Sequence, residues 1–190
     1  MNSIRFIPGF GTDSRVWEKQ KNLFPHDSDQ EIIIAWSLGG FDAFKLYQES
    51  PKKIKALILV SSFPRFIQSE DYLFGTPLAL LRNLERKIEN NYEEGIKYFN
   101  SLIPFDKGTM IPHSDNFCRE KLLFDLARLK NEDYRDQLSR INIPVLLIHG
   151  KNDQIASPEN SIYMSKVIPN SRLELFDSCG HAPFLEDKDR

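Results

Sequence analysis

The chain has 190 residues, 41% of them hydrophobic and 27% charged, a balance typical of one globular domain with a sizeable core. Its 25 basic and 27 acidic residues give a net charge of −2, so no overall field favours nucleic acid or an anionic membrane as a partner. Two cysteines are too few for a disulfide framework, and no apolar stretch approaches the length of a membrane span. The first residues do not have the pattern of a signal peptide, so we expect a cytoplasmic enzyme or binding protein.

Five short apolar runs predict buried strands. The first covers residues 4–7, and four more follow at 32–36, 56–62, 145–150 and 173–176. The runs are mostly β-branched or aliphatic, and the longer ones are apolar on both faces of the predicted strand. Such runs suit a parallel sheet that is covered by helices on both sides, and they therefore predict an α/β fold.

Helical patterns lie between these strands. An apolar face from Phe41 to Tyr47 predicts a helix that Pro51 ends, and Ser157 is expected to cap a helix whose first residue is Pro158. Alternating strands and helices imply right-handed crossovers within one sheet.

Residues 64–142 break this alternation and look all-helical. Apolar residues recur there at helical spacing in three groups: Leu80, Leu84 and Ile88; Tyr92, Ile96, Phe99 and Ile103; Cys118, Leu122, Leu126 and Leu129. An all-helical insert in a parallel sheet is expected to form a lid over the carboxyl ends of the strands, where ligands bind. We therefore predict a core of residues 1–63 and 143–190 with a helical cap at residues 64–142.

One serine lies in the turn between a predicted strand and a predicted helix. The stretch Ala35–Gly39 matches the nucleophile-elbow pattern G-x-S-x-G, with Ala35 in place of the first glycine. Small residues are needed two positions before and after Ser37, because larger ones would clash where strand and helix pack together. The turn would expose the Ser37 hydroxyl at the top of the sheet and make the Leu38 N–H a candidate oxyanion donor. Taken alone, the pattern fits an ordinary glycine-rich turn equally well.

Two later segments supply the partners that a serine nucleophile needs. A general base must take the serine proton, and an acid must orient that base. Asp153 lies just beyond the strand at 145–150, and His181 lies five residues past Phe176, where the next strand ends. The order serine, aspartate, histidine is the one that accompanies a nucleophile elbow. We predict a catalytic triad of Ser37, Asp153 and His181.

Each member of this triad also has a simpler interpretation. Asp153 could only form a turn, and Asp177 is a rival acid that lies too close in sequence to the predicted base to be preferred. Among the other histidines, His26 and His113 lie in polar loops and are expected to be solvated. His149 ends a core strand, where a packed residue is favoured over a base.

The loop after the first strand is expected to lie beside the serine. Gly9 and Gly11 let its backbone bend, and the N–H of Phe10 between them is the second candidate oxyanion donor, although a plain turn explains the same residues. The ring of Phe10 and the indole of Trp36 are candidates for the acyl pocket, and a core role for Trp36 is at least as well supported. This chemistry requires no metal and no organic cofactor.

Together these residues resemble the α/β-hydrolase superfamily. The segments at 8–17, 36–44, 57–66 and 179–186 are most similar to the pimeloyl-[acyl-carrier protein] methyl ester esterases of biotin synthesis. The resemblance covers nearly the whole chain. It implies a serine carboxylesterase with a helical cap on a reduced, mostly parallel sheet of about five strands. The implied substrate is a methyl ester on a short dicarboxylic acyl chain that acyl carrier protein carries.

The resemblance also implies which residues meet the substrate. The N–H groups of Phe10 and Leu38 would form the oxyanion hole. The cap segment expected to contact the acyl chain consists of Phe99, Asn100, Ser101, Leu102 and Ile103. Basic candidates for a carrier-protein dock on the cap helices are Arg82, Arg86, Lys87 and Lys97. Carrier proteins are acidic, which favours such a dock, whereas the interleaved glutamates suit an ordinary solvated face.

The chain departs from the family pattern in two ways. Pro8 stands where the family usually has histidine, and only residues 18–36, 19 in all, separate Trp17 from Ser37, about a strand and two helices fewer than usual. That strand and the N-terminal hairpin strands of the family, none of which we expect in this chain, would lie together outside the strand at 4–7. The remaining five strands would therefore stay contiguous, and the sheet would gain an exposed edge. We expect a monomer, or a homodimer that covers this edge.

Several other functions stay open on the residues alone. A general short-chain carboxylesterase or thioesterase would use the same triad, as would peroxidase or C–C bond hydrolase chemistry. A catalytically silent hydrolase fold that binds a ligand or partner would fit the shortened segment before Ser37. A dehalogenase is disfavoured, because its nucleophile would be a carboxylate at position 37.

Overall fold

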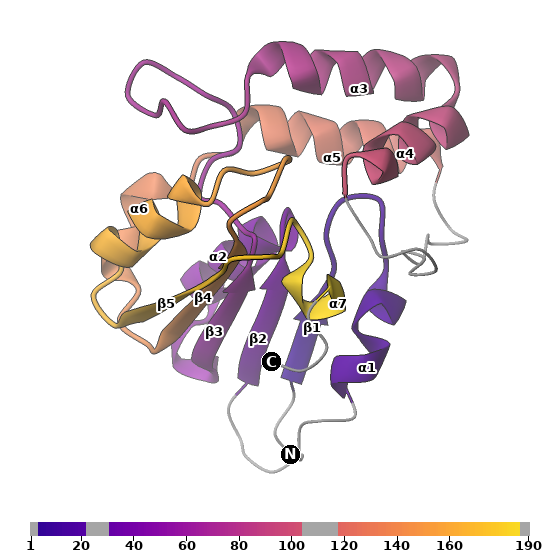
Figure 1. Ribbon diagram of the computed structural model, residues 1–190. Coiled ribbons are helices and arrows are strands. Elements are labelled where there is room, and N and C mark those ends of the chain that lie inside the picture. Colours follow the sequence, from indigo (N-terminus) through magenta and orange to yellow (C-terminus); the bar gives the residue numbers. More distant parts are fainter. Residues whose placement is uncertain (1–3, 22–30, 104–117, 187–190) are drawn as a thin grey trace.

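The computed structural model describes residues 4–21, 31–103 and 118–186. Five strands form one sheet in the order β1-β2-β3-β4-β5, and every neighbouring pair is parallel (Figure 1). The strands are β1 (Ile4–Ile7), β2 (Glu31–Trp36), β3 (Ile54–Val60), β4 (Val145–Gly150) and β5 (Ser171–Phe176). The predicted α/β fold with a five-stranded parallel sheet is confirmed, and each strand end lies within two residues of its predicted position.

The third strand differs most from its prediction, because it covers residues 54–60 instead of 56–62. Ser61 has a φ of 45°, a left-handed backbone that ends the extended run. At the other end, the exposed Lys55 interrupts the apolar pattern although Ile54 before it is buried and paired. Because of this single polar residue, the strand was predicted to start two residues too late.

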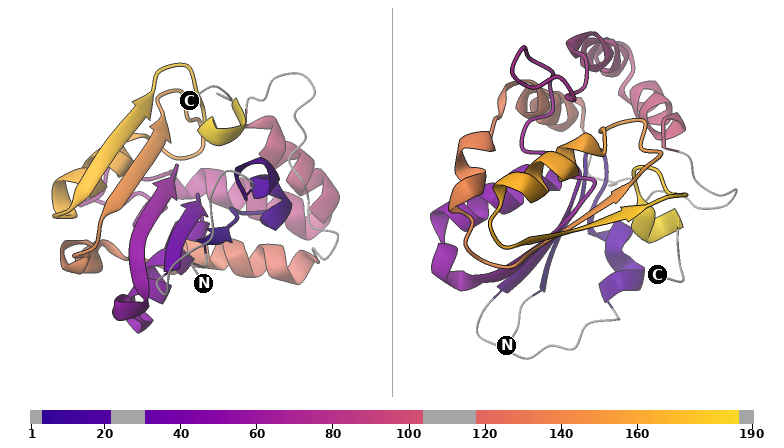
Figure 2. Two further views of the ribbon diagram at one scale, coloured as in Figure 1. Left: turned by 90° about the horizontal axis from the view of Figure 1, so that it is seen from below. Right: turned by 60° about the vertical axis from the view of Figure 1, so that its left-hand side comes forward.

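Helices cover both faces of the sheet, as the uninterrupted apolar strands predict (Figures 1 and 2). One face carries α2 (Gly39–Glu49) and α6 (Glu159–Val167). The other carries the short elements η1 (Ser14–Trp17), α1 (Glu18–Lys21) and α7 (Pro183–Glu186). Two further 3₁₀ turns, η2 (Pro51–Lys53) and η3 (Arg135–Arg140), precede β3 and β4.

Aromatic contacts tie the second face together over a long stretch of sequence. The ring of Trp17 stacks on that of Phe184 with 4.1 Å between centroids, and its indole N–H donates to the carbonyl of Ile7 at 3.3 Å. Phe184 also meets Trp36 edge-on at 5.4 Å. The short helix α7 is therefore anchored against the end of β1 and the end of β2.

The two predicted helix boundaries beside the sheet behave differently. The helix from Phe41 to Tyr47 is confirmed as α2, which ends at Glu49, just before Pro51. The cap predicted for α6 was one residue early, because Pro158 is the N-cap and the helix begins at Glu159. Ser157 still contributes, since its hydroxyl accepts the Glu159 N–H at 3.3 Å.

Three helices lie above the carboxyl ends of the strands (Figure 1). They are α3 (Leu78–Asn90), α4 (Tyr92–Ser101) and α5 (Arg119–Asn131). Helix α3 packs on both of the others. The Asn91 side chain caps α4 by accepting the N–H groups of Glu93 and Glu94 at 3.1 and 3.3 Å. The division into a core and a cap at residues 64–142 stays a prediction.

The segment before α3 was wrongly expected to be helical. Residues 64–77 form turns and isolated bridges, in which Thr76 N–H donates to Phe66 O at 2.7 Å and Gln68 N–H donates to Thr76 O at 3.1 Å. Gly75 packs so tightly on the backbone of this hairpin-like turn that a Cβ there would come 2.5 Å from the Gln68 nitrogen. The apolar residues of this segment gave no signal of that close approach.

The buried stripe of α3 was predicted one residue out of place. Leu81, Leu84 and Ile88 are buried, whereas Leu80 is 56% exposed. At about 100° per residue, Leu81 lies roughly 20° from Ile88 around the helix, and Leu80 lies roughly 80° from it. His26 and His113 lie outside the described residues.

Candidate active site

Ser37 stands in a strained turn between β2 and α2. Its φ is 55°, which a non-glycine residue adopts only at a cost, and its side chain is buried. Two backbone hydrogen bonds hold this conformation: Ser37 N–H donates to Val60 O at 2.9 Å, and Gly40 N–H donates to Ser37 O at 2.9 Å. The turn thus has the backbone geometry that the elbow pattern predicts, whereas the predicted exposure of the Ser37 hydroxyl is wrong, because neighbouring loops bury this residue.

Close backbone contact explains the small residues around this turn. A Cβ on Gly39 would lie 2.7 Å from the Pro8 carbonyl oxygen, and one on Gly40 would lie 2.8 Å from the Ser62 Cβ. A Cβ on Gly9 would lie 3.2 Å from the Ser37 Cβ. The loop after β1 and the start of α2 therefore meet beside the serine, where both predicted oxyanion donors lie.

The structure brings the three predicted triad side chains into one hydrogen-bonded chain. Ser37 Oγ lies 2.9 Å from His181 Nε2, and His181 Nδ1 lies 2.7 Å from Asp153 Oδ2. Ser37 follows β2, Asp153 follows β4 and His181 follows β5, and all three are buried. Their catalytic roles stay predictions, while the geometry lets the serine hydroxyl donate to the imidazole.

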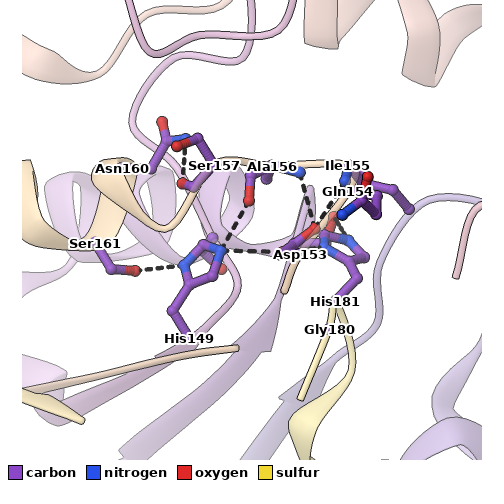
Figure 3. A network of polar contacts seen from close by, with 12 residues as sticks. His149, Asp153, Gln154, Ile155, Ala156, Ser157, Asn160, Ser161, Gly180 and His181 are labelled. Atoms are coloured by element: carbon purple, nitrogen blue, oxygen red, sulfur yellow. Dashed lines mark hydrogen bonds and ion pairs between the residues drawn. The ribbon is translucent and has the colours of Figure 1, made fainter. Parts of the chain in front are cut away.

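Asp153 is surrounded by donors (Figure 3). Its Oδ1 accepts the backbone N–H groups of Ile155 and Ala156 at 2.8 and 3.0 Å, and its Oδ2 lies within 3.0 Å of nitrogens of His181 and His149. Burial raises the pKa of Asp153, but the charge of His181 and the hydrogen bonds of both histidines outweigh it, so the pKa lies well below its usual value. The ionised carboxylate assigns the Nδ1 proton to His181 and leaves its Nε2 as the acceptor.

His149 is fully buried, as expected for the end of a core strand, yet its ring is not merely packed. Nδ1 lies 2.7 Å from Ser161 Oγ, and Nε2 lies 3.0 Å from both Asp153 Oδ2 and the Ala156 carbonyl (Figure 3). The sequence analysis did not connect His149 with Asp153. Their four-residue separation across the end of a strand was the available signal.

The loop that carries His181 packs directly on the end of β4. A Cβ on Gly150 would collide with the Gly180 carbonyl oxygen, so only glycine allows this approach. Asn152 N–H donates to Cys179 O at 2.9 Å, which joins the loop after β4 to the loop after β5. This contact fixes the separation between Asp153 and His181.

Glu186 is a site-supporting residue that the sequence analysis missed. Its carboxylate accepts the N–H of Gly180 at 2.7 Å and the N–H of Ala182 at 3.1 Å, on either side of His181. The short helix α7 returns this side chain to the loop. The local sequence contained a signal for this role, because a carboxylate four to six residues after a loop can turn back and accept hydrogen bonds from the N–H groups of that loop.

Trp36 lies beneath the same loop and is fully buried. Its indole N–H donates to the His181 carbonyl at 2.8 Å, and the two rings are 5.5 Å apart between centroids. Trp36 therefore supports the position of His181 from below, in agreement with the core role considered above. Its contact with an acyl chain stays a prediction.

Helix α4 covers the loop that carries Phe10. The buried Phe10 ring meets the Phe99 ring edge-on at 5.0 Å, and a Cβ on Gly11 would come 3.0 Å from the Ile96 Cδ1. The five predicted acyl-chain residues differ in exposure. Phe99 and Ile103 are buried, Asn100 is half-buried, and Ser101 and Leu102 are exposed. Of these five residues, Phe99 contacts the loop through the ring of Phe10.

The predicted carrier-protein dock lies on α3 and α4. Arg82 and Arg86 are exposed. Lys97 pairs with Glu94 at 3.6 Å, and Lys87 lies 4.7 Å over the Tyr98 ring. The two arginines are thus the members of this set that present their charge most freely to an acidic partner.

A cavity of about 470 Å³ lies between the loop after β1, the start of α2 and helix α5. Its lining includes Pro8, Leu38, Lys121 and Asp125. Lys121 Nζ lies 2.5 Å from Asp125 Oδ2, while the buried Oδ1 has no partner among the described residues. Burial raises the pKa of Asp125, and the lysine only partly offsets this.

The described part of the chain contains neither a metal-binding cluster nor a helix that could span a membrane. No group of three or more histidine, cysteine, aspartate or glutamate side chains there could hold a metal ion. None of the helices in the same residues combines the length and apolar character needed to cross a membrane.

Comparison with known proteins agrees with this geometry. The sequence model of the family described as "Serine aminopeptidase, S33" matches residues 14–188. A pimeloyl-[acyl-carrier protein] methyl ester esterase from Legionella pneumophila (strain Lens) is 34% identical over 189 residues, covering 96% of this chain and 77% of the relative. One of the same name from Nitrosospira multiformis is 29% identical over 190 residues, covering 95% of this chain and 71% of the relative.

Solved structures share the fold at lower identity. The esterase EaEST from Exiguobacterium antarcticum superimposes with a TM-score of 0.85 at 20% identity, over 98% of this chain and 87% of that one. A hydrolase from Oleispira antarctica superimposes with a TM-score of 0.76 at 21% identity, over 99% of this chain and 87% of that one. The chain belongs to the serine aminopeptidase S33 family of α/β-hydrolases, in which its relatives include the pimeloyl-[acyl-carrier protein] methyl ester esterases.

Proposed function

We propose that this protein hydrolyses carboxylic esters through an acyl-enzyme formed on Ser37. The observation that carries the proposal is the continuous chain of contacts from Ser37 Oγ to His181 at 2.9 Å and from His181 to Asp153 at 2.7 Å. A base within hydrogen-bond reach of a hydroxyl, itself oriented by a carboxylate, is the arrangement that activates a serine. The strained backbone at Ser37 supports the same role.

The reaction follows from these positions. His181 Nε2 takes the serine proton as Oγ attacks the ester carbonyl, and the resulting imidazolium donates it to the departing alcohol. Asp153, ionised because its pKa is lowered, stabilises the imidazolium and holds the ring. Water, deprotonated by His181, then attacks the acyl carbonyl, the bond from the carbonyl carbon to Ser37 Oγ breaks, and His181 returns the proton to Oγ as the acid leaves.

Phe10 and Leu38 N–H groups are proposed as the oxyanion donors. Leu38 precedes the first turn of α2, where N–H groups point away from the helix and the helix dipole favours negative charge. Phe10 lies in the loop that packs on Gly39 through the Pro8 carbonyl. The loss of one such donor typically lowers the rate by about 10²–10³.

The proposed substrate is the methyl ester of a pimeloyl chain on acyl carrier protein. Its support is the name shared by the relatives, together with the exposed arginines of α3. A general short-chain carboxylesterase or thioesterase is the second candidate, since the triad geometry is the same for both. The exposed charge on the cap is what favours the carrier-bound substrate.

The nucleophile is tested with Ser37→Ala. We expect the variant to lose p-nitrophenyl acetate hydrolysis and covalent labelling by a fluorophosphonate, because no other hydroxyl lies against His181 Nε2 among the described residues. The matched control is Ser62→Ala, a buried serine next to the elbow whose hydroxyl donates to Val60 O at 3.2 Å. Labelling or turnover retained by Ser37→Ala would remove the proposal.

The substrate is tested by comparing a methyl dicarboxylyl ester on carrier protein with the matching free ester. Reversing charge at Arg82 and Arg86 should weaken kcat/KM for the carrier-bound ester and spare the free one. Lys53→Glu with Lys55→Glu, exposed at the far end of β3, is the matched control. Equal losses on both substrates, or equal effects of both charge reversals, would favour the general esterase.

A further inference from the structure

We propose that His149 is a positioning residue for the triad, which donates its Nε2 proton to Asp153 and thereby fixes the carboxylate oxygen that His181 uses. The inference rests on the proposed function, because it concerns the same site. It goes beyond the three-residue triad by adding a second histidine on the far side of the aspartate. Figure 3 shows the two rings meeting the carboxylate from opposite directions.

The partners of His149 assign its tautomer. Nε2 lies 3.0 Å from Ala156 O and 3.0 Å from Asp153 Oδ2, and a carbonyl and an ionised carboxylate are both acceptors only. Nε2 therefore carries the proton and shares it between the two oxygens. Nδ1 is left to accept the hydroxyl proton of Ser161 at 2.7 Å. A neutral ring satisfies every one of these contacts.

The carboxylate of Asp153 then receives four N–H donors. Two backbone N–H groups, from Ile155 and Ala156, hold Oδ1, and the imidazoles of His149 and His181 share Oδ2. The backbone pair and His149 together set the plane of the carboxylate before His181 contributes. His181 Nδ1 therefore meets an oxygen whose position is already fixed.

This arrangement matters most when His181 becomes charged. The imidazolium formed during the reaction requires an ionised Asp153 in the right plane, and a buried carboxylate stays ionised only if donors compensate for lost water. His149 is one of those donors, because its ring and the Asp153 carboxylate are both fully buried and water does not reach them. Loss of its N–H should therefore reduce kcat more than substrate binding.

The alternative is that His149 only joins β4 to α6 through Ser161. Both interpretations explain why His149 is buried and why its Nδ1 contacts Ser161, but only a role in positioning Asp153 requires His149 to donate a hydrogen bond from Nε2. A glutamine at 149 can place an amide N–H near the Nε2 position, whereas methionine fills similar space and offers no donor. Comparison of His149→Gln with His149→Met therefore separates the two.

The kinetic experiment measures kcat and KM for p-nitrophenyl acetate in the full chain. We expect His149→Met to lower kcat by roughly ten- to a hundredfold with KM within about twofold, the scale of one hydrogen bond to a charged group. His149→Gln should recover to within about fivefold of the wild type. Leu147→Met, a buried residue of the same strand, controls for repacking of β4 and should leave kcat unchanged.

A spectroscopic measurement reads the same contact without turnover. In proton NMR spectra recorded in water, the His181 Nδ1 proton donated to Asp153 should give a strongly downfield line. His149→Met should shift or broaden this line, and Leu147→Met should leave it in place. If the wild type hydrolyses no ester, the proposed function fails, and the NMR comparison alone still decides the role of His149.

Two results would overturn the inference. One is a His149→Met variant with wild-type kcat, and the other is an unmoved His181 line in that variant. Should His149→Met fail to fold, Ser161→Ala replaces it, because loss of the hydroxyl removes the hydrogen bond that holds the Nδ1 side of the ring and so loosens the contact of Nε2 with Asp153. A loss of about two- to tenfold in kcat is then expected, and no loss would count against positioning.

Discussion

Gly39 is where the sequence requirement of the elbow can be tested most sharply. Alanine at a helical position normally stabilises relative to glycine, by up to about 1 kcal/mol. At Gly39 the added methyl would lie 2.7 Å from Pro8 O, 2.9 Å from Ile7 Cγ2 and 3.0 Å from Ile7 O. Two of these three atoms belong to the backbone, which cannot move aside by rotating a side chain.

Forcing an extra methyl into a packed site costs about 1–3 kcal/mol, so the clash should exceed the helical gain. We expect Gly39→Ala to lower the free energy of unfolding by about 1–2 kcal/mol, which is a fall in Tm of roughly 2–8 °C for a chain of this size. Relief of the clash must displace the loop that carries Phe10, so kcat for p-nitrophenyl acetate should fall by at least about tenfold.

Thermal unfolding and steady-state hydrolysis measure the two effects on one sample. Gln48→Ala, at an exposed position of the same helix, is the matched control and should leave both quantities nearly unchanged. A Gly39→Ala variant with a raised Tm would refute the packing argument. A lowered Tm with full activity would show that the position of the loop that carries Phe10 does not control kcat.

Three further predictions concern buried polar contacts. Glu186→Gln should lower kcat roughly tenfold with little change in KM, because an amide cannot accept from both N–H groups that flank His181; a wild-type kcat would contradict this. Trp36→Phe should reduce the free energy of unfolding by about 1 kcal/mol through loss of the hydrogen bond to His181 O, and urea unfolding with an unchanged midpoint would argue against it. The pKa of Asp125 is raised from 3.8 by burial, so the wild type should lose stability relative to Asp125→Asn as pH rises from about 4 through the raised value. Tm measured for both proteins between pH 4 and 7 checks this, and a constant difference would contradict it.

The sheet was predictable because its three central strands, β2, β3 and β4, carry buried apolar residues on both faces. Aliphatic runs such as residues 145–150 need no partner to be recognised, since helices on either side exclude polar alternation. Asp153 and His181 were predictable for a related reason. The carboxyl ends of parallel strands meet at one edge, so polar residues just after β4 and β5 fall beside the serine that follows β2.

The contacts that hold the site in place could not be predicted in the same way. The link from Trp36 to the His181 carbonyl spans 145 residues of sequence, and Gly150 is required only because the Gly180 backbone passes over it. The wrong prediction that Leu80 is buried has a similar cause. Both Leu80 and Leu81 fit the helical spacing of α3, and only the packing of α3 on its neighbours decides which of the two is buried. Such choices depend on contacts between segments, which periodicity within one segment does not contain.

The order of the strands explains how a shortened chain keeps a complete site. Space and sequence follow the same order from β1 to β5, so the loops that carry Phe10, Ser37, Asp153 and His181 follow one another along one edge of the sheet. The additional strands expected in longer family members would lie beyond β1, where they would separate none of these loops. The reduction therefore leaves an edge rather than a gap, and β1 is only four residues long, with the exposed Arg5 paired to Glu31 at 2.7 Å. A short edge strand that carries a charge discourages pairing with another strand, which favours a sheet that ends at β1.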